Sequence, residues 1–123
     1  VVDHRPAYIQ NGDFAGAVGT HCQPAAELAD TLDLDRFDAA IVMSHHLASD
    51  RAYLGELAGS GIGYIGLLGP RHRRERLLAE LGGQAEALQG RIHGPAGLDI
   101  GGRGPGPIAL SIIAEVQKTL AGR

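Results

Sequence analysis

The sequence lacks most of the residues on which disulfide-stabilised and membrane-spanning proteins depend. It has one cysteine, Cys22, and no tryptophan among its 123 residues. A lone cysteine cannot form an internal disulfide, so we expect a protein of the reducing cytoplasm. No apolar run approaches the ~20 residues that cross a bilayer, and no signal-peptide pattern is present, so we expect no membrane association.

The sequence also lacks an excess of positive charge. Its formal net charge is −3 at pH 7, so we do not expect nucleic acid as a partner. Histidine and cysteine occur side by side in His21-Cys22, and histidine is doubled in His45-His46. Adjacent side chains of an extended chain point in opposite directions, so neither pair is arranged to chelate a metal. We therefore expect no metal site.

Short aliphatic blocks alternate with amphipathic blocks of helical length along the whole chain. This rhythm is typical of βαβ units around a parallel sheet, and the length suits one domain, residues 1–123. Residues 38–43 and 64–68 are continuous apolar runs, as strands covered on both faces should be. Residues 15–18 predict a weaker strand, and Val1-Val2 predicts the end of another. The pattern indicates an α/β fold with a mostly parallel sheet.

Three amphipathic blocks separate these strands. Residues 24–32 and 49–57 predict helices, the second capped by Ser49 or Asp50. Residues 71–81 predict a third helix, which a pair of glycines ends.

The last predicted helix begins at Pro105, with Gly104 as its N-cap. Proline is tolerated there because its missing N–H would have no partner within the helix. Apolar residues recur at every fourth position of this helix, at Ile108, Ile112, Val116 and Leu120. That stripe predicts a buried face.

Polar and glycine-rich turns follow two of the predicted strands. In open α/β sheets, ligands bind where the carboxyl ends of strands meet helix N-termini. Ser44 and His45 follow residues 38–43, where an ordinary loop histidine is the alternative interpretation. Gly69 and Arg71 follow the next strand, where a helix N-terminus and a guanidinium suit an anion. The alternative there is a solvated helix face.

A third turn lies in the glycine-rich stretch before the last helix. Its acid, Asp99, is flanked by the apolar Leu98 and Ile100 and preceded by Gly97. A flexible surface loop explains the glycines, but it does not need the apolar neighbours. We therefore favour a defined turn that brings the backbone close to a ligand or to a neighbouring element.

Asp3 supports a different interpretation of the same fold. An acid at the end of a strand bonds the ribose in many dinucleotide-binding folds, so an NAD(P)-binding oxidoreductase domain is an alternative. The GxGxxG phosphate fingerprint that should precede the acid is absent from the sequence. No acid, base or hydride-site residue can be assigned from spacing. A protein-interaction module without a ligand is a further alternative.

Four segments in register resemble one protein family. They are VVDHRP, VMSHH, YIGLLGPRHRRERL and RIHGPAGLDIGGRGPGPIALSIIAEV, and together they extend over nearly the whole chain. This set is similar to the C-terminal domain of the XdhC/CoxI family, accessory proteins of xanthine dehydrogenase and carbon monoxide dehydrogenase. The resemblance implies a Rossmann-like α/β/α domain.

The resemblance further implies a chaperone rather than a catalyst. Such a factor binds the molybdenum cofactor (molybdopterin), works with a cysteine desulfurase during its sulfuration, and delivers it to an apo-molybdoenzyme of the xanthine dehydrogenase type. The turns after the strands match the family's turns at Ser44 to His46, Gly69 to His72 and Gly97 to Gly101. The candidate cofactor-binding residues are Asp3, Ser44, His45, Gly66, Gly69, Arg71, Gly97 and Asp99.

The sequence departs from the family at three of its turns and at its start. His46 stands where an acid or Asn is usual, Pro70 replaces a hydroxyl residue, and Gly104 replaces a capping Thr. The family's first strand and glycine-rich turn have no counterpart, so we expect a fragment that lacks its first βα unit. In a 3-2-1-4-5 sheet that strand is central, and its loss leaves two unpaired edges. We expect a second copy, as a homo-oligomer, or a strand from elsewhere to fill the gap.

Overall fold

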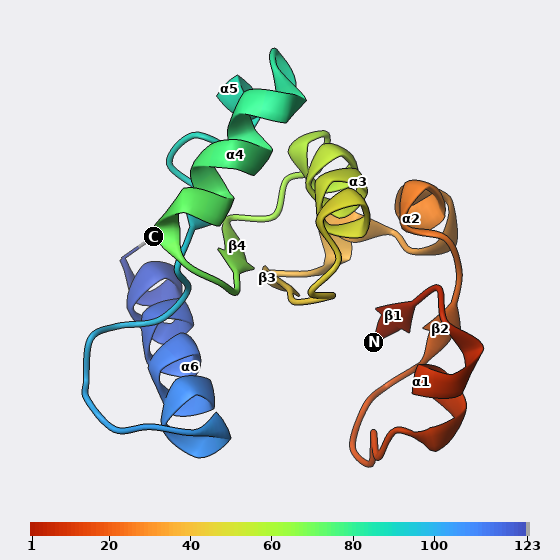
Figure 1. Ribbon diagram of the computed structural model, residues 1–123, viewed down its shortest axis with the longest axis horizontal. Helices are drawn as coiled ribbons and strands as arrows, with labels where there is room; N and C mark the ends of the chain where they lie inside the picture. The colour runs from red at the N-terminus through yellow and green to blue at the C-terminus, as the bar shows by residue number, and fades with distance from the viewer. Residues whose placement is uncertain (123) are drawn as a thin grey trace.

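The computed structural model describes residues 1–122 and has helices on both sides of parallel strands (Figure 1). The strands are β1 (Val2–Asp3), β2 (His21–Cys22), β3 (Ala39–Val42), β4 (Tyr64–Leu67) and β5 (Ile92–His93). The helices are α1 (Pro6–Asn11), α2 (Leu28–Thr31), α3 (Leu47–Ala58), α4 (Arg71–Leu81), α5 (Gln84–Leu88) and α6 (Pro105–Ala121). Short 3₁₀ turns at Ala25–Glu27 and Leu34–Arg36 flank α2. The α/β class predicted from the sequence is confirmed.

Within residues 1–122, the strands form two separate parallel sheets. β1 pairs with β2, and β4 lies between β3 and β5. Val2 pairs with His21 in the first sheet, and Ala39 pairs with Tyr64 in the second. Placed side by side, the strands run β2-β1, then a gap, then β3-β4-β5. This is the Rossmann order 3-2-1-4-5-6 with the place of strand 1 open.

The core lies between the second sheet and the helices α3, α4 and α5. All four residues of β4 are buried, because α3 and α4 cover one face and α6 the other. Leu54 and Leu57 of α3 and Leu77 of α4 are at most 2% exposed. The continuous apolar run of residues 64–68 therefore reflects a strand covered on both faces.

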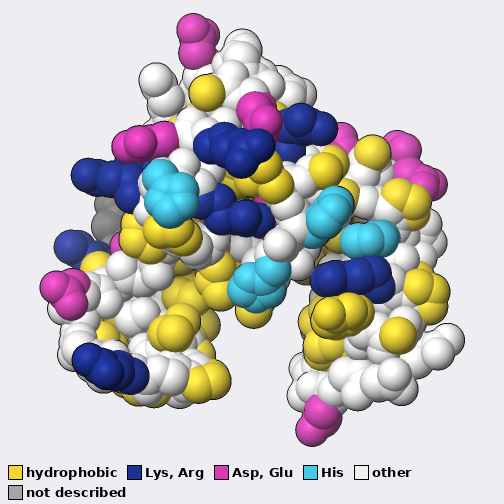
Figure 2. All heavy atoms as spheres, viewed as in Figure 1, with side chains coloured by type: hydrophobic (Ala, Val, Ile, Leu, Met, Phe, Trp, Pro, Cys, Tyr) yellow, Lys and Arg dark blue, Asp and Glu magenta, His cyan; other side chains and the backbone are white. Residues whose placement is uncertain are grey.

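The predicted burial of the α6 stripe is confirmed only in part. Ile112 is buried, and Val116 and Leu120 are half-buried, but Ile108 is 48% exposed. Ile113, beside the stripe, is 63% exposed. Ile41 of β3 is also exposed, so the face of β3 beside α6 is uncovered. The physical reason is that β1 and β3 do not pair, so no segment within residues 1–122 packs on this side of β3 and α6. Figure 2 shows the result as a notch between the arm that carries α6 and the arm that carries α1, with hydrophobic side chains on its walls.

The strand predicted at residues 15–18 was also wrong. This segment is a turn in which Gly16 has a φ of 90° and Val18 is fully exposed. The strand lies a few residues later, at β2, where the backbone meets β1. The short elements α1, α5 and β5 were not predicted because their stretches are too brief to show a period.

The helix ends agree with the sequence predictions better than the strand ends do. α4 begins and ends where predicted, and Gly82 takes a φ of 57° after its last residue. α6 begins at Pro105 after Gly104, as predicted. α3 begins earlier than expected, and its N-cap is His46, whose ring nitrogen accepts a hydrogen bond from the Ser49 amide. In residues 1–122, no helix combines the length and apolar character needed to cross a membrane.

Candidate functional site

The turns after β3, β4 and β5 leave the sheet along a single rim. The Leu68 amide donates to the Val42 carbonyl at 3.1 Å, and the Ala96 amide donates to the Leu67 carbonyl at 3.0 Å. Since all three strands are parallel, their carboxyl ends lie at the same edge. Figure 2 shows cationic and histidine side chains gathered over this part of the molecule.

A buried carboxylate on α3 organises the centre of the rim. Asp50 is 1% exposed, and its Oδ1 accepts hydrogen bonds from the Ser44 hydroxyl at 2.5 Å and the Ser44 amide at 3.2 Å. Its Oδ2 accepts from Arg73 Nη2 at 2.7 Å. Asp50 and Arg73 were not among the predicted site residues. Two features could have found them: an acid one turn inside α3, and the three arginines at the start of α4.

Ser44 therefore has a structural partner, whereas His45 is free to face solvent. His45 is exposed and has a φ of 60°, in the left-handed region where the chain turns sharply between β3 and α3. His46 is the N-cap of α3, and its Nδ1 lies 2.9 Å from the Ser49 hydroxyl. Ser44 and His46 thus both have hydrogen-bond partners within residues 1–122, whereas the exposed His45 ring neither caps a helix nor bridges two segments there.

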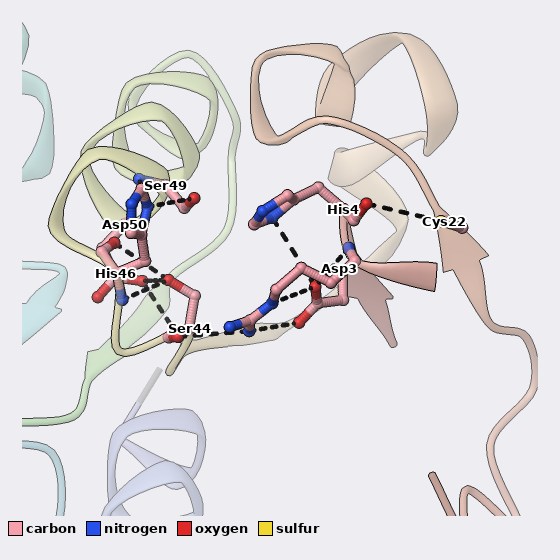
Figure 3. A network of polar contacts seen from close by, with 8 residues as sticks. Asp3, His4, Cys22, Ser44, His46, Ser49 and Asp50 are labelled. Atoms are coloured by element: carbon pink, nitrogen blue, oxygen red, sulfur yellow. Dashed lines mark hydrogen bonds and ion pairs between the residues drawn. The ribbon is translucent and has the colours of Figure 1, made fainter. Parts of the chain in front are cut away.

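Asp3 faces Ser44 across the gap between β1 and β3 (Figure 3). Its two carboxylate oxygens each accept a hydrogen bond at 2.9 Å from the Arg5 guanidinium. Arg5 Nη2 also lies 3.4 Å from the Ser44 carbonyl oxygen, and the guanidinium stacks over the Tyr8 ring at 3.8 Å. These hydrogen bonds hold the pKa of Asp3 below its ordinary value, although partial burial opposes the shift.

The turn after β4 presents a helix N-terminus and an exposed cation. Gly69 has a φ of 111°, and a Cβ there would lie 2.8 Å from Arg73 Cδ, so Arg73 lies directly over this glycine. Arg71 is exposed in the first turn of α4, next to backbone amides that lack helical acceptors. Ser44, Gly69 and Arg73 are thus one cluster, with Arg71 at its edge.

Gly97 and Asp99 belong to the other end of the rim. The Gly97 amide donates to Glu115 Oε1 at 3.0 Å, and its Cα packs against Ser111 of α6. The Leu98 amide donates to the Ser111 carbonyl at 3.1 Å. These contacts tie the turn to α6, and Asp99 is exposed beyond them. A defined turn against a neighbouring element is confirmed, but the structure does not bring Asp99 into the cluster of Ser44 and Gly69.

Gly66 lies inside β4 rather than on the rim. A Cβ at this position would lie 2.9 Å from Tyr64 Cε1, 3.1 Å from Ile41 Cδ1 and 3.2 Å from Ala96 Cβ. Close packing therefore accounts for the glycine. A contact between Gly66 and a ligand stays a prediction.

Behind the rim, Tyr64 and His93 stack with ring centroids 4.4 Å apart. The Tyr64 hydroxyl donates to Glu115 Oε1 at 2.7 Å, and His93 Nδ1 lies 3.6 Å from the same oxygen. Burial and the bond to the carboxylate both raise the pKa of Tyr64. This cluster fixes α6 to β4.

The charged side chains near Ser44 and Gly69 favour anion binding over acid–base catalysis. Near Ser44, the acids Asp3 and Asp50 are each paired with an arginine, so neither is free to act as a base. Asp99, at the other end of the rim, is exposed. Groups of three or more His, Cys, Asp or Glu placed to hold a metal do not occur in residues 1–122. Cys22 is exposed, and its Sγ lies 3.8 Å from the His4 carbonyl oxygen.

Comparison with known proteins identifies the fold more closely. Residues 1–116 match the family model described as the XdhC Rossmann domain. The chain belongs to the XdhC family. This confirms the resemblance drawn from the four sequence segments.

Relatives in this XdhC family are longer than the chain. A Bacillus subtilis protein whose name describes a probable xanthine dehydrogenase subunit is 33% identical over 119 residues, which are 97% of this chain and 34% of that protein. The uncharacterized protein YqeB of Escherichia coli is 30% identical over 98 residues, or 78% of this chain and 18% of that protein. The chain thus spans about a third or less of the curated relatives it matches.

A solved structure shows the same fold. The crystal structure of a xanthine dehydrogenase from Bacillus halodurans is 29% identical and superposes with a TM-score of 0.82. The match covers 99% of this chain and 35% of that chain. The arrangement of helices and strands described above is therefore that of a Rossmann-like domain.

Proposed function

We propose that this XdhC domain belongs to an accessory factor for molybdenum hydroxylases, of the xanthine dehydrogenase or carbon monoxide dehydrogenase type. In this proposal it binds the molybdenum cofactor at the rim and holds it for sulfuration and insertion. The observation that carries the proposal is the cluster at the start of α4. There, an arginine clamped by a buried acid lies over Gly69, beside exposed Arg71 and open backbone amides.

The donor set of this cluster fits the phosphate of molybdopterin. Backbone amides at a helix N-terminus and a guanidinium fork both favour phosphate oxygens. Arg74 follows Arg73 on α4, but its side chain packs against Gly94 and its Nε is buried, so we do not assign it to the phosphate. The ionic pairing of Arg73 leaves Arg71 as the more available of the two guanidiniums.

The residues of the cluster and of the turns beside it have distinct roles in this proposal. Arg71 and the amides after Gly69 bind phosphate, and Asp50 orients Arg73 and Ser44. His45, exposed at the end of β3, and the turn at Gly97 bound the rim on either side of the cluster. When bound, the cofactor supplies the molybdenum centre of the client enzyme, and the protein's part is to bind, orient and shield it.

The proposed partners follow from the same role. A cofactor chaperone must meet the apo-molybdoenzyme that receives its cargo and a cysteine desulfurase that provides sulfur. We place both among the partners of the full protein.

An NAD(P)-binding oxidoreductase is less well supported. Asp3 would have to bond a ribose, but both of its oxygens already accept from Arg5. Recruiting Asp3 would require breaking this bidentate pair.

Thermal unfolding with separate additions of molybdopterin, NAD(H) and NADP(H) tests the proposal. A ligand that binds only the folded state stabilises it by RT ln(1 + [L]/Kd), about 2.7 kcal/mol at a hundredfold excess over Kd. We expect molybdopterin to raise the melting temperature and the nucleotides to leave it unchanged. A shift with NAD(H) or NADP(H) alone would contradict the proposal.

A further inference from the structure

The N-terminus of α3 is capped by a histidine ring. His46 Nδ1 accepts a hydrogen bond from the Ser49 amide at 3.3 Å and lies 2.9 Å from the Ser49 hydroxyl. A ring nitrogen that accepts from an amide carries no proton, so the ring is neutral and has its hydrogen on Nε2. The side chain is exposed, so protons of the solvent can reach it. The cap therefore exists only while Nδ1 is unprotonated.

A histidine cap differs from an ordinary helix cap in its response to pH. The side chains that usually cap helices, those of Ser, Thr, Asn and Asp, keep the same charge between about pH 5 and 8, whereas histidine changes charge in this range. A proton on His46 Nδ1 would replace the acceptor of the Ser49 amide with a second donor. It would also place a positive charge at a helix N-terminus, where the backbone amides already carry a partial positive charge. Protonation of His46 therefore removes the cap.

The main chain of His46 connects the cap to the candidate site (Figure 3). Its amide donates to the Ser44 hydroxyl oxygen at 3.2 Å, and its carbonyl accepts from the Asp50 amide at 2.9 Å. The Ser44 hydroxyl donates in turn to the Asp50 carboxylate, which holds Arg73 over Gly69. The shape of the turn from residue 44 to residue 46 is thus shared between the cap and the cluster at the start of α4.

The charged groups around the capping ring leave no unpaired acid to receive its proton. On the side of β1, the ring faces His4, with ring centroids 6.3 Å apart. Asp3, beside it, is paired with Arg5. On α3, Asp50 is paired with Arg73 of α4. Protonation would therefore break the cap without forming a new ion pair in its place.

We propose that His46 is a positioning residue of the rim. Its neutral ring holds the turn from Ser44 to His46 in the shape that binds an anion, and its protonation loosens that turn and weakens binding. For its effect on a ligand, this inference rests on the anion site of the proposed function. Loss of one helix cap corresponds to about a fivefold change in an equilibrium constant, which sets the size of the effect.

The direction of this effect distinguishes it from simple charge attraction. The rim has further exposed histidines, His45 in the same turn and His72 in the first turn of α4. Protonation of these two rings adds positive charge and strengthens the attraction of an anion. Protonation of His46 acts in the opposite direction, because it removes a hydrogen bond that shapes the site. A variant that keeps the cap but does not titrate separates the two effects.

His46→Asn is that variant, since asparagine caps helices well and keeps its charge. Sulfate is the probe, because its own charge does not change between the two conditions, about pH 8 and about pH 5.5. We expect NMR titration to give equal sulfate affinities for the unmodified protein and His46→Asn at the higher pH. At the lower pH, the unmodified protein should bind sulfate about fivefold more weakly than His46→Asn. Arg71→Ala should weaken binding at both values, which places the sulfate at the start of α4.

Two measurements without any anion test the cap by itself. Nitrogen chemical shifts of the His46 ring at about pH 8 should show the hydrogen on Nε2. Hydrogen exchange at the Ser49 amide should be about fivefold faster in His46→Ala than in His46→Asn at the same pH. His72→Asn is the matched control, because His72 is an exposed histidine that caps no helix. It should keep the pH dependence that the unmodified protein shows at the Ser49 amide.

Three results would overturn the proposal, and they differ in what they exclude. A hydrogen on Nδ1 at about pH 8, or equal Ser49 exchange in His46→Ala and His46→Asn, would exclude the cap. An intact cap together with equal pH dependence of sulfate binding in the unmodified protein and His46→Asn would exclude the link between cap and rim. Sulfate binding that is absent from every variant, with the cap intact, would instead overturn the anion site of the proposed function.

Discussion

Arg73 on α4 and Asp50 on α3 form an ion pair in which Nη2 lies 2.7 Å from Oδ2. The carboxylate is 1% exposed and the arginine side chain 22% exposed, so the pair is largely removed from water. It joins the two helices whose N-termini open onto the rim. Through Asp50 it also fixes Ser44, so the shape of the candidate site depends on one buried charge pair.

Replacing Arg73 should destabilise the fold. Arg73→Ala leaves the Asp50 carboxylate buried without its counter-charge, which costs about 3–5 kcal/mol in comparable cases. Urea unfolding at neutral pH measures the change. Arg76→Ala is the control, since Arg76 is 67% exposed and its contact with Glu80 is 3.9 Å long; it should change the free energy of unfolding by about 0.5 kcal/mol or less. Equal effects of both variants would contradict this account of the pair.

Replacing Arg71 should separate ligand binding from stability. Arg71 is exposed and has no ion-pair partner in residues 1–122, so Arg71→Ala should change the free energy of unfolding by about 0.5 kcal/mol or less. Retention of molybdopterin after gel filtration should fall, because the guanidinium is assigned to the phosphate. Arg36→Ala, at another exposed arginine, should retain the cofactor like the unmodified protein. Unchanged retention in Arg71→Ala would remove this residue from the site.

The pair of Asp3 and Arg5 should make stability depend on acid pH. The hydrogen bonds from Arg5 lower the pKa of Asp3 from its ordinary value of 3.8. A carboxyl with a lowered pKa stabilises the folded state above that ordinary value and loses this effect as the pH falls through the folded value. The difference in urea midpoint between the unmodified protein and Arg5→Met should be constant near neutral pH and shrink below pH 3.8. A difference that persists at the acid limit would show that the pair acts through packing alone.

Tyr64 should make the stability of the fold depend on alkaline pH, with stability lost as the pH rises. Burial and the bond to Glu115 raise its pKa above the ordinary value of 10.0. An acid with a raised pKa stabilises the fold fully below that ordinary value, and the contribution is lost as the pH rises. Tyr64→Phe should therefore cost about 1–3 kcal/mol at neutral pH, by removing a hydrogen bond to a carboxylate. Its stability should decline less steeply than that of the unmodified protein above pH 10.0, as followed by circular dichroism; parallel declines would contradict the assignment.

Gly66 should respond to substitution as a packing position. Gly66→Ala forces a methyl group against Tyr64, Ile41 and Ala96, and overpacking of this kind typically costs about 1–3 kcal/mol. Gly106→Ala is the control, because nothing lies within 4 Å of a Cβ at that position of α6. That variant should be neutral or slightly stabilising in thermal unfolding. A Gly66→Ala protein as stable as the control would mean that β4 can shift to admit the methyl group.

The local elements with strong patterns could be predicted from sequence. α4 and α6 follow from their periodicity and from the prolines and glycines at their ends, and β3 and β4 from their uninterrupted apolar runs. The position of the rim could also be predicted from sequence, because parallel strands place their carboxyl ends at one edge of the sheet. The prediction of a strand at residues 15–18 was wrong, because a short apolar block has no period that distinguishes a strand from a turn.

The pairings within the site could not be predicted. Asp50 was interpreted as a helix cap, because a sequence shows that an acid begins a helix but not which arginine lies above it. Arg71 and Arg73 are two residues apart on α4, and only the packing of α4 on α3 decides which one meets the buried carboxylate. Likewise, the position of Asp99 in the sequence does not show that the neighbouring Gly97 contacts Glu115 and Ser111 of α6.

The sequence by itself determined the α/β class and the family, since these depend on local patterns and on motifs in order. The tertiary structure decided which charges are paired, which face of α6 stays exposed and where the open place in the sheet lies. Those outcomes depend on contacts between segments far apart in the chain. The energies of these contacts are set by burial and geometry, and neither can be deduced from the residues next to each other in the sequence.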